Sequence, residues 1–150
     1  MKNSLRTFLV LTVAATCAFA FAQGVTGVWK GKIKMDMSKL PAPKDEQGKK
    51  MMAQVKDMMA KITITMTLNA NKTYTIKATG IPGKEASQTS EGTWSQSGKS
   101  ITMTPTKENG KKATGENAKK QTMTLSADGK TISMAVPGAG QMGGSIIFTR

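Results

Sequence analysis

The sequence predicts an all-β protein: an eight-stranded antiparallel meander barrel, or a strongly curved half-barrel, with one amphipathic helix between its first two strands. Apolar and polar residues alternate along a series of short segments, which is typical of half-buried strands. Turn signals rich in Gly, Pro, Asn and Asp separate most of these segments. Eight strands joined in sequence order are enough to close a sheet around a packed core or one small ligand.

The predicted strands are short, and threonine or lysine occupies many of their outward positions. In the first strand, Trp29, Ile33 and Met35 share one face, and Lys30 and Lys32 lie on the other. Threonine on an outer face fits a pleated, half-exposed surface. The eight segments cover residues 27–35, 62–68, 74–78, 92–94, 101–105, 123–125, 132–136 and 146–148.

Two stretches show neither the two-residue alternation of a strand nor the spacing of a helix, and they are predicted to be loops. Residues 106–119 are polar and contain several Lys and Gly. We expect Pro105 to end the fifth strand and this stretch to follow it as a mobile loop. Residues 137–144 are rich in glycine and connect the last two strands.

One helix is predicted over residues 45–61. Its apolar residues fall at the spacing of a single helix face: Met51, Met52, Val55, Met58 and Met59. Asp45 and Glu46 stand at its start and Lys61 at its end, which is the charge order that the helix dipole favours. The helix is therefore amphipathic, with methionine on its apolar face.

Residues 1–22 are predicted to be a signal peptide and residues 23–150 a single barrel domain. Lys2 and Arg6 precede an uncharged apolar stretch, which ends in a small-x-small cleavage site at Ala22. We therefore expect an exported protein, periplasmic or extracellular. An uncleaved anchor is the alternative, although the apolar stretch is shorter than the roughly 20 residues that span a bilayer.

The chain contains one cysteine, Cys17, and it lies within the predicted signal peptide. Lipidation of Cys17 is an open alternative to simple cleavage, but Ala14-Ala15-Thr16 before it matches the usual lipidation pattern poorly. After cleavage the domain would have no thiol and no disulfide. Its stability must then come from its apolar core, which a chain of this length can bury.

The predicted mature domain is strongly basic. Two of the 22 Lys and Arg lie in the signal peptide and all nine Asp and Glu lie outside it, which leaves a net charge of +11. Such a charge suits an anionic envelope surface, or it is simply a solvated surface. Aromatic residues are few and do not interleave with the lysines, so no specific nucleic-acid binding is expected. We expect a monomer.

Three further residues resemble those of the lipocalin-like, or calycin, barrels. Gly27-Val28-Trp29 lies on the first strand and Arg150 closes the last. In that group a first-strand Gly-x-Trp packs at the closed end of the barrel, near a basic residue from the last strand. The resemblance covers most of residues 24–150 and implies the same packing for Gly27, Trp29 and Arg150.

The resemblance also implies a binding cup. The connection between the first two strands lies over the open end of such barrels, so the helix would be a lid with its methionine face toward the interior. Methionine suits a surface that repacks around varied apolar guests. Alternatively, the same methionines complete the core of a small barrel. The residues expected to contact a ligand are Met51, Met52, Val55, Met58, Met59, Met66, Tyr74, Met103 and Met134.

The residue types argue against an enzyme. The chain has no histidine, and its only cysteine is in the predicted signal peptide, so the usual general base, thiol nucleophile and zinc ligands are missing. We expect no catalytic residue, no cofactor and no metal site. Methionine is the one unusual count, and thioethers suit Cu(I). Methionine in place of leucine in the core explains most of that count better.

The sequence thus predicts a non-enzymatic extracytoplasmic protein that binds a small apolar or amphipathic ligand. Two alternatives remain: an envelope interaction or structural protein that uses its basic surface, and Cu(I) handling by methionine. A ligand cavity discriminates the first from the second, because such sites usually measure roughly 300 Å³ or more.

The cleavage site can be checked directly. Protein recovered from its own host should begin at Gln23, because small residues occupy positions 20 and 22. Intact mass spectrometry measures this start. Retention of residues 1–22, or an acyl group on Cys17, would contradict the prediction.

Overall fold

The computed structural model describes residues 24–35, 45–84, 86–136 and 144–150; the predicted signal peptide, Cys17, Met37 and most of the Gly-rich loop lie outside them. The described residues form nine strands, one α-helix and one 3₁₀ helix. In chain order these are β1 Gly27–Met35, α1 Glu46–Lys61, β2 Thr63–Leu68, β3 Thr73–Thr79, β4 Gln88–Ser97, β5 Ser100–Glu108, β6 Lys111–Lys112, η2 Gly115–Ala118, β7 Gln121–Leu125, β8 Thr131–Ala135 and β9 Gly144–Thr149.

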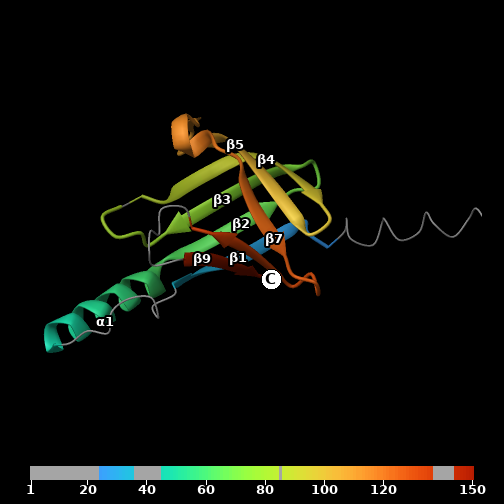
Figure 1. The fold of residues 1–150 in the computed structure, drawn as a ribbon. Helices are drawn as coiled ribbons and strands as arrows, with labels where there is room; N and C mark the ends of the chain where they lie inside the picture. The colour runs from blue at the N-terminus through green and yellow to red at the C-terminus, as the bar shows by residue number, and fades with distance from the viewer. Residues whose placement is uncertain (1–23, 36–44, 85, 137–143) are drawn as a thin grey trace, which may run out of the picture.

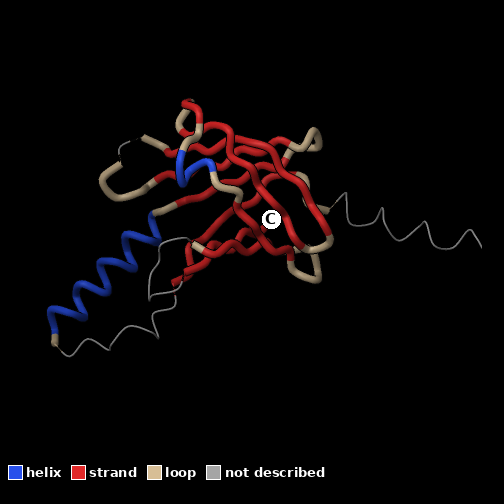
Figure 2. Tube along the Cα trace, turned by 45° about the horizontal axis from the view of Figure 1, so that its top comes forward, coloured by secondary structure: helices blue, strands red, loops and turns tan. Residues whose placement is uncertain are grey.

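Eight of these strands close into an antiparallel barrel (Figures 1 and 2). Each strand pairs with the next along the chain, except that β5 pairs with β7 past the two-residue β6, and β9 pairs with β1 to close the ring. The predicted eight-stranded meander barrel, with its helix between the first two strands, is confirmed. Closure gives each of the eight strands a partner on both sides over at least part of its length.

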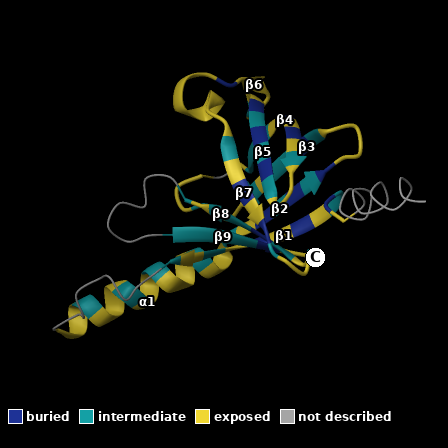
Figure 3. Cartoon of the chain, turned by 45° about the vertical axis from the view of Figure 1, so that its right-hand side comes forward, coloured by how far each residue is buried: buried dark blue, intermediate teal, exposed yellow. Residues whose placement is uncertain are grey.

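Apolar side chains form the buried core of the barrel. Figure 3 marks the buried residues in dark blue, and most of them lie on the strands. They come from every strand of the ring, because the inward positions of a strand recur every second residue. No charged or polar side chain is buried among the described residues. The core consists of Val25, Trp29, Ile64, Met66, Leu68, Tyr74, Trp94, Ile101, Met103, Met123, Leu125, Ile132 and Phe148.

Two tryptophans plug one end of the barrel, and we call it the plugged end. Trp29 is fully buried, and its indole Nε1 donates to the carbonyl oxygen of Val25 at 2.9 Å. Trp94 is buried beside the β2–β3 turn, where its Nε1 donates to the carbonyl oxygen of Asn69 at 3.0 Å. Each indole therefore buries its apolar body while its one polar group keeps a partner.

A cation covers each of these indoles. The guanidinium carbon of Arg150 lies 4.4 Å from the ring centroid of Trp29, and the Nζ of Lys72 lies 4.0 Å from that of Trp94. Arg150 also donates to the carbonyl oxygens of Gly24 and Thr26, the second at 2.8 Å. The structure thus brings Gly27, Trp29 and Arg150 together, since Gly27 leaves its Cβ position open toward the Arg150 guanidinium.

Residues 106–119 are more ordered than the sequence indicated. Pro105 does not end β5, which continues to Glu108, and β6 and η2 follow within the stretch expected to be a loop. The pairing of β4 with β5 shifts register between Glu91 and Gly92. A side chain at Gly92 would overlap the carbonyl oxygen of Thr104, so glycine permits this close approach. Proline is tolerated inside a strand at such a bulge.

Helix α1 forms as predicted but buries nothing completely. Asp45 caps it by accepting a hydrogen bond from the backbone N of Gly48 at 2.7 Å. None of its residues is buried, and the helix projects away from the barrel (Figure 1). The expectation that it lies across the barrel as a lid is therefore wrong. Only its last two turns lie near the barrel, because the helix runs directly into β2.

The Trp29 plug should contribute much of the stability of the barrel. Replacing Trp29 with alanine should lower the free energy of unfolding by about 3–5 kcal/mol, since the change removes a fully buried indole. Val28→Ala is the matched control, because Val28 is the neighbouring residue and is 54% exposed. Urea denaturation of both variants measures the difference. A Trp29→Ala loss below about 1 kcal/mol would contradict the plug.

Candidate functional site

The candidate site arises where strand β1 outruns its neighbour β2. The two strands pair only from Gly27, opposite Leu68, to Gly31, opposite Ile64. On its other side β1 stays paired with β9 as far as Met35. Beyond Gly31 the chain that lies beside β1 is therefore the end of helix α1, and a helix cannot continue a strand ladder. This mismatch opens a groove between β1 and α1.

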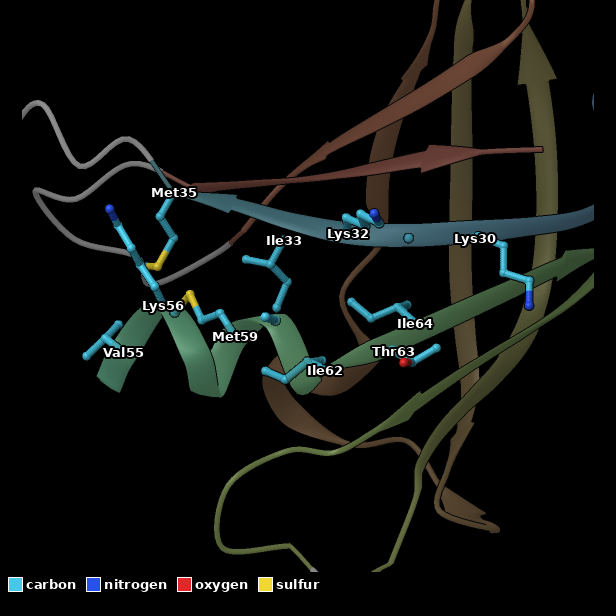
Figure 4. Close-up of a pocket in the computed structure, with 12 residues that line it drawn as sticks. Lys30, Lys32, Ile33, Met35, Val55, Lys56, Met59, Ile62, Thr63 and Ile64 are labelled. Carbon is cyan, nitrogen blue, oxygen red and sulfur yellow. The ribbon is translucent and has the colours of Figure 1, made fainter. Parts of the chain in front are cut away.

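The groove has a volume of about 510 Å³ (Figure 4). That volume falls within the range of roughly 300–1,000 Å³ that is usual for small-molecule sites. Its walls come from three consecutive elements, namely the second half of β1, the last two turns of α1 and the start of β2. The lining residues are Lys30, Gly31, Lys32, Ile33, Met35, Val55, Lys56, Met59, Ala60, Ile62, Thr63 and Ile64.

Apolar side chains from both walls form the floor of the groove. Ile33 points from β1 toward the end of the helix, where Ile62 and Met59 lie (Figure 4). Ile33 and Ile62 are half-buried and also pack against the barrel core. Ile64, buried at the start of β2, connects the floor with that core. The groove therefore lies outside the core but rests directly on it.

The charged residues of the groove are all cationic. Lys30 and Lys32 come from the outward face of β1, and Lys56 extends from the helix (Figure 4). No carboxylate is among the lining residues. All three lysines are exposed, and none makes an ion pair with another described residue. The site is thus apolar at its floor and positively charged at its rim.

The predicted helix residues fall into two groups. Val55 and Met59 line the groove, and Met52 is half-buried beside them on the helix. Met51 and Met58 do not line it and are 60% and 42% exposed. The helix thus turns only part of its apolar face toward the barrel.

The predicted barrel residues are packed into the core. Met66, Tyr74 and Met103 are almost completely buried in the core, and none of them lines the groove. The Tyr74 hydroxyl lies 3.3 Å from the Ser90 Oγ, and burial raises the pKa of Tyr74. A ligand among these side chains would have to displace them. Met134 is only half-buried, in the cross-strand row that joins it through Ile146 to the groove.

Sequence reasoning missed most of the groove. The alternating pattern places Ile33, Ile62 and the lysines of β1 on strand faces, and nothing local marks them as parts of one site. A usable signal in the sequence is that the first predicted strand, residues 27–35, is longer than the second, residues 62–68. Such a difference leaves one end of the longer strand without a partner on that side.

A second hollow lies at the plugged end and has a different character. It measures about 580 Å³ and is lined largely by the β7–β8 turn, together with Gly24 and Arg150. Asp128 in that turn accepts hydrogen bonds from the Ser126 hydroxyl and from the backbone N of Lys130, which lower the pKa of its carboxyl. Both contacts hold the turn in shape, so Asp128 acts within its own hairpin.

The described residues contain no cluster of the side chains that usually bind metal ions. No three His, Cys, Asp or Glu among them are grouped as metal ligands. Thioethers are the exception, because Met35 and Met59 extend toward one another across the groove (Figure 4). Within the described ranges, no helix has the length and apolar character that crossing a membrane requires.

Comparison with known proteins identifies the family. The model of the NlpE N-terminal domain matches residues 57–134, from the second half of α1 to β8. No curated protein and no solved structure shows significant similarity to the chain. The matched segment is more than half of the chain and contains most of the barrel ring. On this match, the chain belongs to the NlpE N-terminal domain family.

Proposed function

We propose that this protein is a non-enzymatic, exported envelope protein that binds a small amphipathic ligand in the groove between β1 and α1. The observation that carries the proposal is the groove itself, about 510 Å³ with an apolar floor and a lysine rim. The groove combines apolar surface with free volume, whereas the apolar side chains of the barrel core are buried. The isoleucine and methionine side chains there are half-buried, so a bound ligand that covers their remaining apolar surface would gain binding free energy.

Two further observations support this assignment. Membership in the NlpE N-terminal domain family supports an envelope-associated protein and therefore export to the periplasm or beyond. The Gly27, Trp29 and Arg150 arrangement, in a closed eight-stranded meander barrel, supports kinship with lipocalin-like barrels. If the chain is related to those barrels, its ligand would bind in the outer groove and not in the barrel interior, because two indoles and several methionines occupy the interior.

Cu(I) binding is a second candidate for the same groove. Met35 and Met59 present two soft thioether sulfurs toward one another (Figure 4), and Cu(I) favours such ligands. The lysines of the rim disfavour it, because they add positive charge close to a cation. An amphipathic guest with acidic character would instead use both the floor and the rim.

The floor of the groove can be tested with a matched pair of methionines. Met59→Gln should weaken binding of a fluorescent fatty acid about tenfold, equivalent to about 1.4 kcal/mol, because it places an amide on the apolar floor. Met51→Gln should leave binding unchanged, since Met51 is exposed on the same helix and does not line the groove. Fluorescence titration measures both. Equal affinities for the two variants would contradict the site.

A leucine variant separates the two candidate ligands. Met35→Leu with Met59→Leu removes both sulfurs but keeps an apolar groove of similar volume. Amphiphile binding should then survive, whereas Cu(I) binding measured by competition with a chromogenic chelator should be lost. If the fatty acid no longer binds while the barrel stays folded, the sulfurs themselves carry the function and the amphiphile assignment fails.

A further inference from the structure

The proposed function leaves the polar end of the ligand undefined, and the charges around the groove define it. We infer that the natural guest is an anionic lipid with a single acyl chain, whose head group is attracted to the lysine rim of the groove, Lys30, Lys32 and Lys56, while its chain lies on the Ile33–Met59–Ile62 floor. This inference rests on the proposed function, because it assigns the chemical class of the ligand in the same groove.

The lysines of β1 form a row that nothing opposite them neutralises. Lys30 and Lys32 lie two residues apart on one strand face, which places their Cα atoms about 7 Å apart. The cross-strand partners of Lys30 are Thr65 and Thr149, and that of Lys32 is Ile147. Like charges at this spacing repel one another, and a bound anion relieves that repulsion.

The row of outward lysines on β1 continues beyond the groove. Lys34 is the next outward residue of β1, and its partner on β9 is Ser145. On the helix, Lys56 lines the groove, whereas Asp57 does not. Among the described residues that line the groove, the charged side chains of both walls are therefore all cations. Lys30 and Lys56 lie at opposite ends of the groove (Figure 4). A carboxylate or phosphate beside one of these ammonium groups would accept a charge-assisted hydrogen bond from it, and the other lysines would add attraction at longer range.

The apolar floor fixes the other end of the guest. Ile33, Met59 and Ile62 are half-buried, so each still exposes apolar surface that an acyl chain would remove from water. A volume of about 510 Å³ suits one chain better than the two chains of a bilayer phospholipid. Methionine adapts its shape to chains of different length. These features favour a monomeric single-chain lipid over a folded peptide or a flat membrane surface.

The test compares two lysolipids with the same myristoyl chain, one with an anionic phosphatidylglycerol head and one with a zwitterionic phosphatidylcholine head. Binding to the full mature chain is measured by isothermal titration below the micelle concentration of each lipid. The anionic lipid should bind at least about tenfold more tightly at low salt, and the preference should shrink in about 0.5 M salt as charges are screened.

Two triple variants with the same loss of charge test the site of that preference. Lys30→Gln, Lys32→Gln and Lys56→Gln together should abolish the preference for the anionic head. The control changes Lys99, Lys111 and Lys120 to Gln; these are exposed lysines outside the groove, and the preference should persist. Circular dichroism confirms that both variants fold, which is expected because all six lysines are exposed.

Each outcome bears on one claim. If both lysolipids bind equally well and Met59→Gln weakens both, the groove is a ligand site but the anionic head is wrong. If neither binds, the proposed function fails together with the inference. Binding only to phosphatidylglycerol vesicles, or a groove closed by a second copy of the chain at doubled mass in analytical ultracentrifugation, would overturn the inference in favour of a surface contact.

Discussion

The pairing of β1 with β9 is the contact on which the rest of the structure depends. It turns a chain of sequential hairpins into a closed ring and leaves the interior with a fixed, small volume. Trp29 and Trp94 fill one end of that volume, and methionine, isoleucine and leucine fill the middle. Each indole is held by a hydrogen bond to a backbone carbonyl and covered by a cation, so the plug is fixed in both position and orientation. In a barrel closed in this way, these buried side chains occupy the interior.

The same closing ladder creates the groove. β1 follows β9 to Met35, whereas it leaves β2 at Gly31, so its second half projects past the start of β2. Helix α1 must end where β2 begins, and its last turns therefore come to lie beside that projecting half. The outward lysines of β1 and the apolar face of the helix meet there because of this register. The amphipathic groove is thus a consequence of how the ring closes. A ligand could bind there without displacing the side chains of the core.

The strands and the helix could be predicted because their signals are local. Inward positions must be apolar in a closed sheet whose interior is a packed core, and the alternation from β1 to β9 follows that rule. The extension of β5 past Pro105 could not be predicted, since it depends on the bulge at Gly92 on a different strand. Of the groove, only Val55 and Met59 were predicted, because helical spacing marks them. Lys30 and Ile33 join them through the register of β1, which no local pattern encodes.

The central claim is that binding takes place outside a packed barrel, and amide chemical shifts of the mature protein titrated with a single-chain anionic lipid test it most directly. The account predicts perturbations concentrated in residues 30–35 and 55–64, which form the two walls of the groove. Amides of the core around Met66, Ile101 and Met123 should stay where they are, because those side chains are fully packed. Large shifts throughout these core positions, with little change in the groove, would contradict the account and restore an interior site.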